Sequence, residues 1–205
     1  MKIKTDDTGR SMVEIIGVLA IVGVLSVGGI AGYVTASRNL RINNLKDEVS
    51  TLVANVRSMF FSAENYESVN DITLINAGLV PTWMIDADRL HIHNKNRGSV
   101  TIAPADYEYK ENGAFILIFN GLNPIACREL AISNWGSDVA TGFLAVSIKK
   151  DGDLTIEDSG LTDARVTGSE TVILAHDISS GTLKQVYDLC DCHSGDTCAI
   201  AWKFL

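Results

Sequence analysis

The stretch GRSMVEIIGVLAIVGVLSVGGIAGYV, residues 9–34, decides the fold of this chain. Its last twenty residues, 15–34, contain neither a charged residue nor a proline. A helix of about twenty residues rises about 30 Å, which matches the hydrocarbon core of a bilayer. One carboxylate, Glu14, stands at the head of this run. Because a buried carboxylate is costly without a partner, it has to be neutralised by a lipid headgroup, a basic side chain or another molecule.

The composition indicates one globular domain behind this segment. The chain has 205 residues, of which 46% are hydrophobic and 20% are charged, so it is neither a disordered chain nor a multi-span membrane protein. About 170 residues remain beyond the apolar run, which is enough for a domain with its own core. The net charge of −8 argues against a dedicated nucleic-acid site, since such sites need a basic surface.

The predicted helix continues past the apolar run. Hydrophobic residues recur at steps of three and four, which marks one face of a helix: Leu45, Val49, Leu52, Val53, Val56, Met59, Phe60 and Ala63. The other positions carry polar and charged residues, namely Arg41, Lys46, Asp47, Glu48 and Arg57. We therefore expect one helix from about residue 11 to near residue 64, apolar all round in its first half and amphipathic in its second.

The four cysteines all lie in the C-terminal part, at Cys127, Cys190, Cys192 and Cys198. An even number beyond a membrane segment favours disulfides in an oxidising compartment. The alternative is a zinc site that adds His193 to the last three cysteines, but the spacing is not that of a standard finger. Positive charges are nearly balanced on the two sides of the span, so the cysteines, not the charges, place the C-terminal domain outside.

Local signals predict the elements of this C-terminal domain. Three helices are expected: one within 71–81 capped by Asp71, one that begins at Asn123-Pro124 with Cys127 facing inward, and one at 182–189. Two hairpins are expected, one over 107–119 that turns at Asn112-Gly113 and one over 142–156 that turns at Asp151-Gly152. Further strands are expected at 99–103, 171–174 and 199–204.

Two clusters of potential metal ligands have a structural alternative. Asp151, Asp153, Glu157 and Asp158 offer carboxylates for calcium, but the spacing is not that of an EF-hand, and Asp-Gly specifies a turn by itself. His91 and His93 flank one residue and could share a metal, but alternating polar residues on a surface strand are the better explanation. We expect the structural role in both cases, and no metal or other cofactor.

Three interpretations of the N-terminus are open. A basic start at Lys2 and Lys4 suits a secretory signal, but the apolar run is longer than usual and no Ala-x-Ala site closes it. A plain single-span anchor explains the length, but neither Glu14 nor the Gly9-Arg10 step before it.

The third interpretation is a resemblance. The N-terminus has the glycine Gly9, followed by Arg10, a glutamate at the fifth position after the glycine, and an uncharged run. This pattern resembles the class III signal of type IV prepilins. In that family a membrane aspartyl peptidase cuts after the glycine and methylates the new N-terminus. The resemblance implies cleavage between Gly9 and Arg10, methylation of Arg10, and a role for Glu14 in assembly beside the N-terminus of a neighbouring subunit. Arg10 departs from the hydrophobic residue usual in that place.

A second segment, LINAGLVP at residues 74–81, is similar to one that follows the long helix of type IVb pilins. Together the two matches imply an α+β fold, the type IV pilin fold, in which a long N-terminal α-helix packs on an antiparallel β-sheet head with a disulfide-bounded C-terminal region. The implied segments are a leader at 1–9, a membrane-spanning half-helix at 10–35 that becomes the filament core, an amphipathic half-helix at 36–66 and a globular head at 67–205.

The resemblance also assigns roles within these segments. Gly23 is the expected place of local unwinding in a filament. Apart from the resemblance, the spacing of Gly28 and Gly32 predicts a small-residue face for close helix packing. One bridge of the family implies Cys127 with Cys190, which leaves Cys192 with Cys198, and the competing pairing joins Cys127 to Cys198.

The implied function is structural. No nucleophile elbow, phosphate loop, zinc-protease helix or dinucleotide fingerprint occurs, so we expect no catalytic residue. The implied partners are the chain itself, a prepilin peptidase, an inner-membrane assembly platform and, before assembly, membrane lipid. The precursor would cross the inner membrane once with its head in the periplasm, and then join an extracellular pilus. The alternatives are a minor pilin, a type II secretion pseudopilin and a membrane-anchored binding module.

Overall fold

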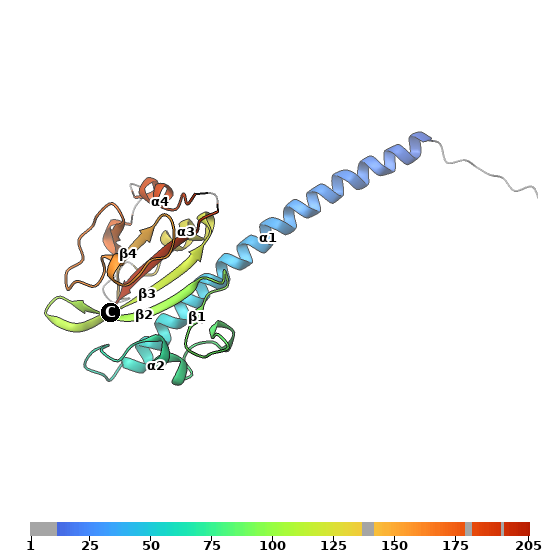
Figure 1. The fold of residues 1–205 in the computed structure, drawn as a ribbon. Coiled ribbons are helices and arrows are strands. Elements are labelled where there is room, and N and C mark those ends of the chain that lie inside the picture. The colour runs from blue at the N-terminus through green and yellow to red at the C-terminus, as the bar shows by residue number, and fades with distance from the viewer. Residues whose placement is uncertain (1–11, 137–141, 179–181, 194) are drawn as a thin grey trace, which may run out of the picture. The chain divides into compact units, whose positions relative to one another are not determined.

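The computed structural model describes residues 12–136, 142–178, 182–193 and 195–205. Its contacts divide the chain into two units, residues 1–41 and residues 42–205. Helix α1, Met12–Phe60, contributes to both units (Figure 1). It ends earlier than predicted, because the N–H of Ala63 turns back to the carbonyl of Phe60 at 3.0 Å, and the rest of the predicted amphipathic half-helix up to residue 66 is not helical.

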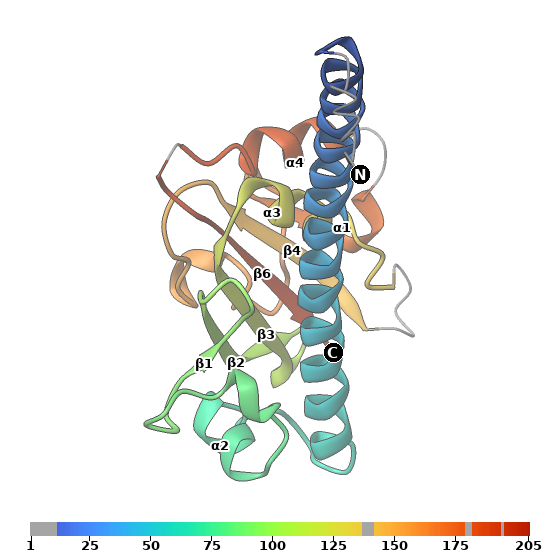
Figure 2. The same ribbon diagram turned by 90° about the vertical axis from the view of Figure 1, so that its right-hand side faces the viewer.

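The second unit is built on one six-stranded antiparallel sheet in the order β1-β2-β3-β6-β4-β5. The last strand of the chain, β6, lies inside the sheet between β3 and β4 (Figure 2). The strands are β1 Ile92–His93, β2 Ser99–Tyr107, β3 Lys110–Leu122, β4 Phe143–Lys149, β5 Val172–Leu174 and β6 Cys198–Phe204.

Helices and short turns cover this sheet. Besides α1, they are α2 Asp71–Asn76, η1 Thr82–Met84, α3 Pro124–Ala131, η3 Glu157–Ser159, η4 Ala175–Asp177 and α4 Leu183–Leu189. The fold thus agrees with the predicted class, a long N-terminal helix with an antiparallel sheet.

The two faces of the sheet have separate cores. On one face the buried residues of the second half of α1, from Leu45 to Phe60, join the side chains of Phe115, Phe119 and Trp202 in one cluster. Alternating residues of the same strands point to the other face, where the segment that carries Leu154 and Leu161 covers them. This alternation is why β3 and β6 are buried along most of their length, as expected of inner strands covered on both faces.

Polar contacts fasten the second half of α1 within its unit. The Nε of Arg57 donates to the carbonyl of Leu205 at 2.8 Å, and the Nδ2 of Asn55 donates to the carbonyl of Leu79 at 2.6 Å. Lys46 pairs with Glu129 of α3 at 3.5 Å. The amphipathic half of the helix is therefore bound to the head by hydrogen bonds as well as by its apolar face.

The first predicted turn is displaced. Strands β2 and β3 turn at Glu108 and the residue after it, since Tyr107 pairs with Lys110. Asn112, predicted to form the turn, lies in β3 with a φ of 53°. Its N–H donates to the carboxylate of Asp106 at 2.9 Å beside an irregularity in the register. The Asn-Gly pair therefore serves a bulge and not the hairpin turn.

The second predicted hairpin is wrong. Strand β4 pairs with β5 and β6, and residues 153–156 form no strand. Instead the side chain of Asn120 on β3 captures that segment, because its Oδ1 accepts from the N–H of Leu154 at 2.9 Å and its Nδ2 donates to the carbonyl of Leu154 at 3.3 Å. Asp151-Gly152 does turn the chain, with a φ of 78° at the glycine, but the segment after it packs on a face of the sheet instead of pairing as a strand.

The structure shows which residues cap the short helices α2 and α3, and so tests two further predictions. Asn123 caps α3 as predicted, since its Oδ1 accepts from the N–H of Ala126 at 2.9 Å and Pro124 is the first helical residue. For α2, the predicted cap Asp71 is wrong. Asn70 caps that helix through the N–H of Thr73, and the carboxylate of Asp71 accepts from the N–H of Ile102 on β2 at 2.7 Å.

Candidate assembly site

The first half of α1 presents apolar side chains in every direction. Ile16, Val24 and Val27 are 60%, 74% and 70% exposed, and every side chain of this helix from Glu14 to Ala36 is exposed in the described chain. Among the described residues, one helix, the stretch Glu14–Phe60, is long and apolar enough to cross a membrane. An exposed apolar surface of this size needs lipid or other helices to cover it.

The acidic residue of this segment lies where the sequence placed it. Glu14 is in the first turn of α1, with its side chain exposed. A carboxylate there faces the positive end of the helix dipole, which is a favourable position even before a partner arrives. The predicted cleavage and methylation residues, Gly9 and Arg10, lie outside the described residues.

The glycines of the span leave open surface. A Cβ at Gly23, Gly28 or Gly32 would have no heavy atom within 4 Å outside the local helix backbone. Because a missing side chain lets another backbone approach closely, this part of α1 offers a site for helix packing. Helix α1 is continuous through Gly23 in this structure.

Two disulfides organise the C-terminal part of the head. Cys127 on α3 bonds to Cys190 at the end of α4, and Cys192 bonds to Cys198 at the start of β6. This is one of the two pairings that the sequence left open, and no cysteine remains free for a metal. The longer bridge spans 63 positions and ties the two short helices together, so that the segment between them, including β4 and β5, is anchored at both ends.

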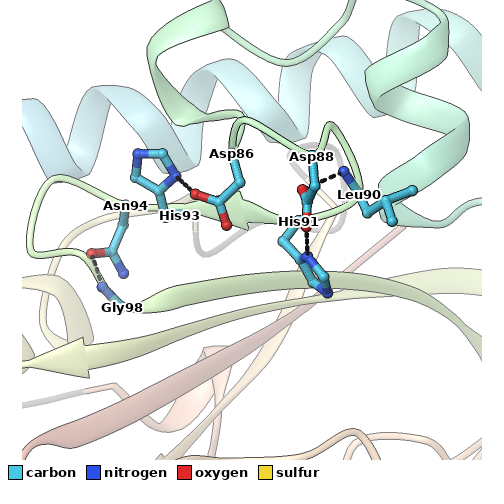
Figure 3. Close-up of polar contacts among 7 residues, drawn as sticks. All are labelled: Asp86, Asp88, Leu90, His91, His93, Asn94 and Gly98. Atoms are coloured by element: carbon cyan, nitrogen blue, oxygen red, sulfur yellow. Dashed lines mark hydrogen bonds and ion pairs between the residues drawn. The ribbon is translucent and has the colours of Figure 1, made fainter.

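The histidines before β2 pair with the aspartates of the preceding loop. The Nδ1 of His91 lies 3.0 Å from the carboxylate of Asp88, and the Nδ1 of His93 lies 3.0 Å from that of Asp86 (Figure 3). The N–H of Leu90, followed by the His91 ring, lowers the pKa of Asp88. Ligand atoms of Asp86, Asp88 and His91 converge within 4.8 Å, but all three residues are exposed, Asp88 contacts His91, and Asp86 contacts His93.

Two of the four carboxylates considered as calcium ligands make other contacts. Asp151 receives the N–H of His193 at 2.8 Å and lies 2.6 Å from its ring, and these contacts lower the pKa of Asp151. Asp158 pairs with Lys149 at 3.5 Å. Among the described residues, the ligand atoms that converge here belong to Asp151, His193 and Asp196, so the four carboxylates do not form one group, as the structural alternative implies. The loop is thus held to the disulfide region by a His-Asp pair.

One acidic residue was wrongly assigned to the polar surface of the helix. Glu48 is only 2% exposed, because the loop that carries Lys95 covers it. The helical period alone gives no sign of this, since Glu48 adjoins the buried Val49 on the border of the apolar face. Only the loop that carries Lys95 could have indicated that Glu48 is buried, and this loop is distant in sequence.

Comparisons with known proteins agree with this geometry. The PilS family, described as PilS N terminal, matches residues 39–201. Two proteins named major structural subunit of bundle-forming pilus, from Escherichia coli O111:H- and from Escherichia coli O127:H6, are each 26% identical over 154 residues, which cover 74% of this chain and 77% of each relative.

A solved structure shows the same fold. The crystal structure of TcpA, a type IV pilin from the El Tor biotype of Vibrio cholerae, superposes with a TM-score of 0.56 at 19% identity and covers 81% of this chain and 99% of that one. The family match spans most of the described head and the second half of α1. The chain therefore belongs to the PilS family of type IVb pilins.

Proposed function

We propose that this chain is the major structural subunit of a type IVb pilus, a filament of many copies of itself. The observation that carries the proposal is the apolar half of α1, which is exposed on every side and continues into the helix half that the head binds. The related proteins of Escherichia coli are themselves named major structural subunits of the bundle-forming pilus. The family is one of structural subunits and not of enzymes.

Assembly would exchange one apolar environment for another. Before assembly, residues 10–35 would span the inner membrane with the head in the periplasm, where the two disulfides form. In the filament, sister helices would replace the lipid, with Gly28 and Gly32 allowing close approach and Gly23 as the point of unwinding. A prepilin peptidase would supply the mature N-terminus, an inner-membrane platform would add subunits, and the finished pilus would be extracellular.

Glu14 would select the register of the added subunit. Cleavage after Gly9 exposes the amine of Arg10, which stays cationic with or without a methyl group. Placed beside Glu14 of the neighbouring subunit, this cation offsets the cost of burying the carboxylate. The acidic residue is then unfavourable in an isolated buried helix and satisfied in the filament.

Substitution of Glu14 tests this role. The Glu14→Ala variant, expressed with a type IVb peptidase and assembly machinery, should enter the membrane and lose its leader but give no surface filaments. Cell fractionation and electron microscopy of sheared material measure the two outcomes. Glu64→Gln, a charge loss at an exposed site just beyond α1, serves as the control and should assemble. Normal filament yield from Glu14→Ala would refute the assembly role.

A further inference from the structure

Glu48 is a buried carboxylate that no step of the proposed assembly uses. It lies in the second half of α1 beside Val49, which is fully buried. One of its oxygens, Oε2, accepts from the backbone N–H of Lys95 at 3.3 Å. The other, Oε1, is buried and has no hydrogen-bond partner among the described residues. A buried acceptor without a donor is costly, and for a carboxylate the cost is larger.

This side chain lines an open cavity of about 300 Å³ between α1 and the segments around η1 and β1. The residues around it are Asn44, Asp47, Glu48, Thr51, Pro81, Trp83 and Lys95. Most of them are polar or charged, so the cavity offers hydrogen-bonding groups to a polar side chain.

The charges around the cavity are unbalanced toward the negative. Asp47 and Glu48 provide two carboxylates, and Lys95 provides the one cation among the lining residues. The ammonium of Lys95 lies 3.9 Å from the centre of the Trp83 ring, where it makes a cation–π contact. Its backbone, and not its ammonium, is the group that hydrogen-bonds Glu48.

Burial raises the pKa of Glu48 to about 7, although the N–H and the charge of Lys95 lower it. Asp47, the neighbouring acid on the helix, raises it further. In the separate subunit near neutral pH, the carboxyl group is therefore divided between its neutral and charged forms. A second cation beside Oε1 would favour the charged form and would in turn be held by it.

We propose that this cavity is a docking site for a lysine or arginine side chain of a second copy of the chain in the filament. The proposal rests on the proposed function, because a filament repeats one surface contact at every subunit. The long side chain would enter past Asp47, and Glu48 would turn its buried Oε1 toward the cavity to accept a hydrogen bond from it. A second copy is the occupant because the acidic cavity complements a basic group, and because the chain belongs to a family of subunits that assemble with themselves.

The test compares wild-type filaments with filaments in which the Glu48 carboxylate is replaced by an amide of the same shape. Wild-type, Glu48→Gln and Glu111→Gln filaments are sheared from cells and incubated at pH 7.5 in increasing urea, and released subunits are separated by sedimentation. Glu111 is exposed on β3 and gives the same loss of charge. We expect Glu48→Gln filaments to release subunits with an apparent dissociation constant about tenfold higher, as for the loss of one charge-assisted hydrogen bond. Glu111→Gln should match the wild type.

A folding control separates docking from stability. Thermal unfolding of the full-length Glu48→Gln chain in detergent micelles should show a head at least as stable as the wild type, since a buried charge is removed. If its filaments resist urea as the wild-type filaments do, the proposal is overturned. If the wild type itself forms no filaments, the proposed function fails first, so the two failures are distinguishable.

The occupant is identified by cross-linking. A photo-reactive phenylalanine derivative in place of Asn44, at the rim of the cavity, is activated in assembled filaments of the otherwise wild-type chain. The expected product is a dimer in which position 44 is joined to a lysine- or arginine-containing peptide of the second copy. Attachment to lipid, to a different protein, to a peptide without a basic residue, or to no second chain contradicts the proposal.

Discussion

At the scale of single residues, Glu48 shows what burial does to an acid that the helical period assigns to the surface. Its folded pKa of about 7 lies above the ordinary value of 4.5. Between these values the unfolded chain has released a proton that the folded chain keeps, so the free energy of unfolding decreases as the pH rises toward 7 and levels off above it. Asp71, whose pKa burial raises to about 6, adds the same trend at lower pH.

We predict that the wild-type chain loses about 1 kcal/mol of stability between pH 6 and pH 8 through Glu48 alone. Glu48→Gln should remove this part of the pH dependence, while Glu111→Gln should keep it. The measurement is urea unfolding of the full-length chain in detergent micelles at pH 6, 7 and 8, followed by tryptophan fluorescence. A Glu48→Gln chain whose stability falls as steeply as that of the wild type would show that Glu48 does not cause this part of the pH dependence.

At the scale of elements, the disulfides differ in the length of chain that they close. Cys127–Cys190 spans 63 positions and Cys192–Cys198 spans 6. In the loop-entropy model, the longer loop is worth about 4 kcal/mol and the shorter about 2 kcal/mol. Removing each bridge in turn therefore compares a long loop with a short one within the same head.

We predict that replacing Cys127 and Cys190 together by alanine destabilises the head by about 4 kcal/mol, and that replacing Cys192 and Cys198 together costs about 2 kcal/mol. Thermal unfolding of the two full-length double variants in detergent, each beside the wild type, gives the comparison. Equal losses, or a larger loss for the short bridge, would show that strain or local packing outweighs loop closure.

The sequence predicted those elements whose signals are local. The period of three and four predicted most of the buried face of α1, although Met59 and Ala63 are exposed, and Asn123-Pro124 predicted the start of α3. The two turn pairs were misassigned. Asn112 and Gly152 both adopt a positive φ, but a positive φ occurs in a bulge or a loop as well as in a hairpin turn. Their real positions depend on distant contacts, such as that of Asn120 with Leu154.

The same limit applies to the candidate sites. Glu14 stands out because it is one charge before a long uncharged run, so its position is visible in the sequence. Glu48 is buried by a loop some 47 positions away, and the residues next to it in sequence give no indication of its burial. Sequence patterns therefore found the residue proposed to start assembly and missed the one proposed to dock a neighbouring head.

At the scale of the whole molecule, the two halves of α1 have different tasks. The second half completes the core of the head through its buried face. The first half keeps its apolar side chains exposed, which a water-soluble monomer would not tolerate. We infer that the chain is stable in two settings, with this segment in lipid or among sister helices, and that removal of the leader allows the change from one to the other.

The intact mass of the main protein in filaments sheared from the cell surface tests this central claim most directly. We predict that the dominant species begins at Arg10, carries one methyl group and is lighter by four hydrogens through its two disulfides. A chain that stays in the membrane fraction as a single copy, with residues 1–9 still attached, would contradict it.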